Sequence, residues 1–122
     1  MAVSIQELIN QKDKIEQKKQ ETFDLDTSVG KLTVKKITKG LMAEIMAITD
    51  GSDEYCILQT VVEPNLRDAT LQQAYGCVEP TDIIEKLFDA GEIPAIARKI
   101  SQLSGYGKDI ESKSKVHEDV KN

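Results

Sequence analysis

The side chains that could carry out chemistry in this chain of 122 residues are few and far apart in the sequence. His117 is the only histidine, and it lies in a polar stretch near the C-terminus, where a catalytic dyad or a zinc site would find no further ligands. Cys56 and Cys77 are the only cysteines, and neither has a Cys-x-x-Cys partner. Because both lie in apolar or semi-apolar segments, we interpret them as small core residues of a reducing compartment, with a disulfide between them as the alternative.

Two other patterns are weak candidates for a ligand site. Residues 105–108 read Gly-Tyr-Gly-Lys, but they lack the spacing and the following Ser or Thr of a phosphate-binding P-loop, and they follow a predicted helix rather than a strand. Asp24 and Asp26 alternate along a predicted strand with no third metal ligand nearby, so we interpret them as the solvated face of a hairpin. Nothing converges on an active site, and we predict neither an enzyme nor a cofactor.

The composition fits one small domain that works by binding. Hydrophobic residues make up 39% of the chain and aromatic residues only 4%, so the core must consist mainly of Ile, Leu, Val and Ala. The net charge of -5 counts against nucleic acid, because binding to phosphate backbones requires clustered Lys and Arg. No apolar run is long enough for a signal peptide or a membrane span, so we expect a soluble protein of the cytoplasm.

The hydrophobic pattern predicts a helix-dominated α+β fold, mostly α with one small β-hairpin near the N-terminus. A capping box at Ser4 and Glu7 begins a polar helix within residues 1–20. The charged side of this helix is either a solvated face or a docking surface for a partner, and its thin apolar edge consists of Ile5, Leu8, Ile9 and Ile15. Alternating residues on both sides of a turn at Val29-Gly30 then predict the hairpin.

The remaining body, which we place within residues 21–107, reads as a series of helices separated by Gly and Pro. Thr38 caps a helix that Gly51 ends, and Ser52 caps the next and most buried helix, which includes Val61 and Val62. Pro64 ends that helix. Asp68 caps a short helix that ends near Gly76, Pro80 opens another that Gly91 ends, and Pro94 lies in the first turn of the last. Residues 108–122 are polar, and we expect a mobile or weakly helical tail.

The same segments carry a resemblance to a known family. A hairpin ending in "LTVKKIT" is followed by a helix, by "VVEPNLRDATLQQAYG", by "EPTDIIEKLFDAGEIPAIARKISQLSGYG" and by a polar tail ending in "VKN". This order resembles the tail assembly chaperones of phages and prophages, in particular the XkdN-like family, over residues 30–105 and the terminal Lys121-Asn122. The helix at Pro80 and the triplets "GEI" and "LSG" are the most characteristic parts. The Gln- and Lys-rich N-terminal helix departs from the shorter leader of the family.

The resemblance implies a mostly helical protein of the host cytoplasm that is absent from the mature virion. It implies that the chain binds the long, aggregation-prone tape measure protein while the tail tube polymerises around it. The tail tube protein and a second copy of the chain are further candidate partners, whereas neither nucleic acid nor a membrane is expected. Ile5, Leu8 and Ile9 are then the candidate partner-binding residues.

Two other functions stay open at this point. One is a structural head or tail component of a phage particle, which the sequence does not separate from a chaperone. The other is a small phage regulatory protein, which the net charge of -5 and the lack of a basic recognition helix disfavour.

Overall fold

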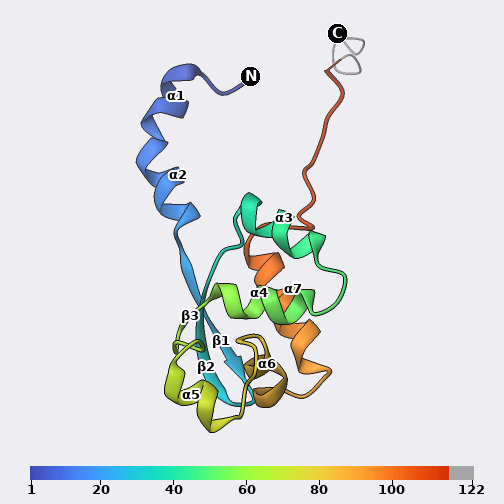
Figure 1. Cartoon of the computed structure of the whole chain (residues 1–122). Coiled ribbons are helices and arrows are strands. Elements are labelled where there is room, and N and C mark those ends of the chain that lie inside the picture. The colour runs from blue at the N-terminus through green and yellow to red at the C-terminus, as the bar shows by residue number, and fades with distance from the viewer. Residues whose placement is uncertain (116–122) are drawn as a thin grey trace.

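The computed structural model of the chain describes residues 1–115 and contains helices around a three-stranded antiparallel sheet (Figure 1). The sheet makes the fold α+β rather than all-α, as the predicted hairpin requires. The elements in chain order are α1 (Ile5–Asn10), α2 (Lys12–Lys19), β1 (Thr22–Thr27), β2 (Gly30–Lys35), α3 (Lys39–Ala47), α4 (Ser52–Thr60), β3 (Val61–Glu63), α5 (Ala69–Ala74), α6 (Asp82–Leu87) and α7 (Glu92–Leu103).

The predicted hairpin is confirmed. β1 and β2 are antiparallel neighbours, and the pair Thr27 and Gly30 leaves a two-residue turn between the strands. Gly30 has a φ of 125°, a conformation that glycine adopts without steric cost. The side chain of Glu92 at the start of α7 accepts hydrogen bonds from the backbone N–H and the hydroxyl of Ser28 in this turn. These bonds hold the pKa of Glu92 below its usual range and fix the tip of the hairpin to α7.

The third strand was not predicted. Val61 and Val62 were assigned to the end of the buried helix, but α4 ends at Thr60, and Val61–Glu63 pairs with β2 as β3. The physical reason is that β-branched residues favour strands and that Pro64 keeps Glu63 out of helical geometry, while the far edge of β2 offers free hydrogen-bonding groups. Pro64 therefore ends a strand and not a helix.

The core lies between the sheet, α4, α6 and α7. Four isoleucines in these helices are completely buried, namely Ile57, Ile83, Ile84 and Ile100. α4 packs against α3, α6 and α7, and it is the one helix of residues 1–115 without an exposed residue, which agrees with the prediction that it is the most buried helix. This aliphatic core agrees with the low aromatic content of the sequence. Each of these side chains stabilises the fold by about 1.5–3 kcal/mol when it is removed from water.

Several helix boundaries differ from the prediction. Gly51, with a φ of 84°, is the N-cap of α4 and does not end α3, whose last residue is Ala47. Ser52 is accordingly the first helical residue rather than the cap. Gly91 likewise precedes α7 instead of ending α6. A glycine between two closely spaced helices can serve either one, and the local sequence does not decide which.

Pro80 also lies outside the helix that it was expected to open. α6 starts at Asp82, because the carboxylate of Asp82 accepts hydrogen bonds of 2.9 Å from the N–H groups of Val78 and Glu79 and folds this segment into a turn before the helix. These two bonds lower the pKa of Asp82. Pro94 does lie in the first turn of α7, as predicted.

Candidate partner-binding surface

The first 20 residues form an arm that projects from the body (Figure 1). We call residues 1–20 the N-terminal arm; all of them are exposed. Ser4 caps α1 as predicted, since its hydroxyl accepts a hydrogen bond of 3.1 Å from the N–H of Glu7. The Glu7 carboxylate accepts a hydrogen bond of 3.1 Å from the same hydroxyl instead of from the backbone N–H of Ser4, so only half of the predicted capping box is formed. The expected single helix is interrupted at Gln11, which divides it into α1 and α2.

The arm carries the apolar edge that the sequence predicted. Ile5 is 74% exposed, Leu8 46% and Ile9 59%, and Ile15 continues this edge in α2. Positions separated by three and four residues lie on the same side of a helix, so Ile5, Leu8 and Ile9 form a narrow stripe on α1. Short helices without tertiary packing are marginal in water, so contact of this stripe with a partner would stabilise the arm as well as the complex.

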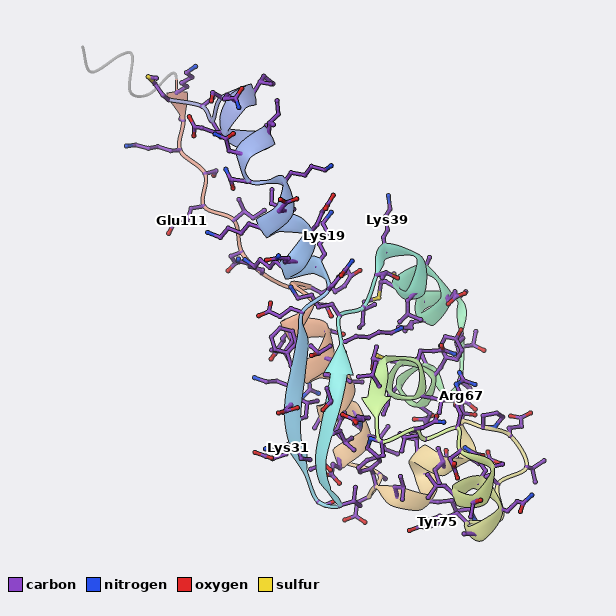
Figure 2. The ribbon with its side chains drawn as sticks, turned by 90° about the vertical axis from the view of Figure 1, so that its left-hand side faces the viewer. Lys19, Lys31, Lys39, Arg67, Tyr75 and Glu111 are labelled. Atoms are coloured by element: carbon purple, nitrogen blue, oxygen red, sulfur yellow. The ribbon has the colours of Figure 1, made fainter. Side chains whose placement is uncertain are left out.

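Lys36 makes noncovalent contacts between the base of the arm and the sheet. The Lys36 ammonium donates a hydrogen bond of 2.6 Å to the carbonyl of Lys18 in the last turn of α2. It also lies 3.5 Å from the carboxylate of Glu21 and 5.8 Å from the centre of the Phe23 ring. A cation at a helix C-terminus is favourable because it interacts with the partial negative charge of the terminal carbonyls. These contacts hold the end of α2 against β2. Figure 2 shows Lys19 at this end of the arm, with side chains projecting around the helices.

The cysteines are placed as the sequence indicated. Both are free thiols; Cys56 is buried in α4 and Cys77 is half-buried. Burial, together with the nearby Asp53 carboxylate, raises the pKa of the Cys56 thiol to about 11. Because the thiolate is the nucleophilic form, Cys56 is poorly suited to covalent catalysis.

The other sequence candidates do not form a site either. Asp24 accepts a hydrogen bond of 2.9 Å from the hydroxyl of Thr33 across the hairpin. Within residues 1–115, no group of three or more His, Cys, Asp or Glu side chains could hold a metal ion. The Gly-Tyr-Gly-Lys stretch follows the C-terminal end of α7, where a phosphate would meet carbonyl groups rather than N–H donors. His117 lies outside the described residues.

One feature of the body was missed by the sequence-based interpretation. α3 has a broad apolar side, but none of its residues is buried, and Met46 is 78% exposed. Beside this helix is an open groove of about 240 Å³, between α3, α4 and α7. Its apolar lining consists of Met42, Ile45, Cys56, Pro94 and Ala97. Met42 packs partly against the core, whereas Met46 is exposed. A methionine pair on the apolar side of a helix suits core packing as well as an adaptable binding surface, and it is the one signal in the sequence for this groove.

The sequence profile of the phage XkdN-like tail assembly chaperone proteins matches residues 5–121. This match takes in nearly the whole chain. The chain belongs to this family. The match begins at Ile5 and so includes the N-terminal arm, although the arm was expected to depart from the family pattern. No curated protein and no solved structure matches the chain. The tail assembly chaperone also has no helix within residues 1–115 that is long and apolar enough to cross a membrane.

Proposed function

We propose that this tail assembly chaperone binds the tape measure protein of its phage and keeps it soluble while the tail tube assembles around it. The observation that carries the proposal is the match of the family over residues 5–121, which makes a phage tail component the partner to look for. The chemistry of the arm supports it, since an exposed apolar stripe on a polar helix suits an apolar helical partner. We place the contact at Ile5, Leu8 and Ile9.

The proposed contact is a helix-in-groove or helix-on-helix interaction. The tape measure protein would cover the apolar stripe, and the Lys and Glu residues around it would remain in water. Recognition of this kind depends on anchors at i, i+3 and i+4, which is the spacing of these three residues. The half-covered apolar side of α3 is a second surface that the same partner, the tail tube protein or another copy of the chaperone could use. The chaperone works without catalysis in this proposal.

A chaperone and a structural tail component differ in where the protein ends up. We expect the chain to be abundant in the host cytoplasm during assembly and to be missing from purified mature particles. Quantitative mass spectrometry of both fractions measures this, with the tail tube protein as the internal control for a particle component. A fixed number of copies of the chain per particle would contradict the chaperone proposal and favour the structural role.

A further inference from the structure

The outer edge of the sheet is open for hydrogen bonding. The strand order is β1-β2-β3, so β1 has a neighbour on one side only. In an antiparallel hairpin with a two-residue turn, the two residues that flank the turn form backbone hydrogen bonds with each other. The cross-strand pairs at every second position from there are hydrogen-bonded in the same way. Thr27, Leu25 and Phe23 therefore bond to β2, whereas the N–H and C=O groups of Asp24 and Asp26 point away from it. Within residues 1–115 these outward groups have no backbone hydrogen-bond partner.

An apolar groove runs beside this open edge. It lies between β1 and α7, and its apolar lining is made by Leu25, Ala95 and Ile96. Leu25 is half-buried and Ala95 is exposed, so apolar surface there remains in contact with water. In Figure 2 the hairpin stands in front of α7, and no other element of residues 1–115 lies beyond the outer edge of β1. An added strand would place every second side chain into the groove.

The opposite side of β1 carries negative charge. Asp24 and Asp26 are both exposed and alternate with the half-buried Phe23 and Leu25, so their side chains leave the strand on the side opposite Leu25, although both also line part of the groove. If β1 paired with β1 of a second copy in antiparallel fashion, these carboxylates would lie close to their counterparts, and like charges across a strand pair are destabilising. The edge therefore disfavours self-pairing. It favours a strand that carries Lys or Arg at the positions opposite the two aspartates.

We propose that β1 binds an extended segment of a partner protein as a fourth strand. The segment alternates apolar residues, which lie in the groove against Ala95 and Ile96, with Lys or Arg, which face Asp24 and Asp26. Main-chain hydrogen bonds between the segment and β1 provide affinity, and the alternation of apolar and basic side chains provides specificity for the sequence of the segment. This surface is separate from the N-terminal arm, so the inference does not rest on the proposed function.

A synthetic peptide tests this strand addition with the full-length chaperone. The probe is a fluorescent seven-residue peptide in which valine and lysine alternate, and its binding is measured by anisotropy. We expect saturable binding that a matched valine-glutamate peptide lacks. Asp24→Lys with Asp26→Lys should weaken binding of the lysine peptide about tenfold or more, because two favourable charge pairs become repulsive. The control pair Asp13→Lys with Asp109→Lys makes the same change in net charge at exposed sites outside the sheet, and it should bind as the wild type does.

Methylation of the peptide backbone separates strand addition from simple charge attraction. One peptide is N-methylated at every lysine and a second at every valine. In a strand pair only alternate N–H groups point at the neighbouring strand, so one of the two peptides should lose binding and the other should keep it. Equal binding of the two methylated peptides, or no binding of the unmethylated one, would overturn the proposal. Replacement of Ile5, Leu8 and Ile9 by serine should leave peptide binding unchanged.

Discussion

Replacing Ile5, Leu8 and Ile9 together by serine is expected to remove the tape measure protein from its complex with the chaperone. Each side chain contributes roughly 1–2 kcal/mol when a partner covers it. Loss of all three should therefore weaken binding by at least about a hundredfold, since each 1.4 kcal/mol is a factor of about ten. The measurement is the amount of tape measure protein that copurifies with a tagged chaperone after coexpression.

A matched control variant distinguishes the effect of losing the apolar side chains from the effect of changing the helix propensity of the arm. Gln6, Asn10 and Gln17 lie on the opposite side of the same arm, and all three are exposed. Serine at these positions imposes a similar change in helix propensity without touching the apolar stripe. We expect full copurification of the control variant and an unchanged urea melt for both variants. Copurification that survives replacement of the stripe would contradict the placement and move the contact to the body, where the groove beside α3 is the next candidate.

Ile84→Ala is expected to destabilise the body strongly. The Ile84 side chain is completely buried in α6, and truncation leaves a cavity whose cost is typically 2–5 kcal/mol. Ile110→Ala makes the same chemical change at a site that is 89% exposed, and it should alter the free energy of unfolding by less than about 0.5 kcal/mol. Urea melts of the two variants against the wild type measure the difference.

Pro80→Ala provides a second comparison within the same segment. Pro80 is exposed and precedes α6, and its carbonyl accepts a hydrogen bond of 3.1 Å from the side chain of Gln72. Alanine keeps this carbonyl, so we expect a loss of about 1 kcal/mol or less. A greater loss for Pro80→Ala than for Ile84→Ala would contradict the assignment of Ile84 to the core.

Features that depend on neighbouring residues in the sequence were predictable. The hydroxyls of Ser4 and Thr38 and the carboxylate of Asp68 each accept the expected capping hydrogen bond. The alternation around Val29 and Gly30 likewise predicted the hairpin. In each case a few adjacent residues contain both the donor and the acceptor, or both sides of the turn, so no distant contact is needed to decide the structure.

Features that depend on distant segments were not predictable in the same way. Val61 and Val62 extend an apolar run that suits a helix or a strand, and the choice depends on the free edge of β2, nearly thirty residues earlier in the chain. The stripe on the arm was visible as a pattern, but its exposure was not, because a pattern does not show whether the body covers it. The groove beside α3 depends on how three helices pack and has no local signal beyond the methionine pair.

Binding of the tape measure protein by this chaperone is tested by the solubility of the tape measure protein when it is expressed with and without the chaperone. We predict that the tape measure protein is found in the pellet when expressed alone, moves to the soluble fraction on coexpression, and copurifies with the chaperone. A chaperone carrying Ile84→Ala serves as the control for a fold-dependent effect, and it should give less soluble tape measure protein. Tape measure protein that stays in the pellet, or becomes soluble without forming a complex with the wild-type chaperone, would contradict the proposal that this chain binds it and keeps it soluble.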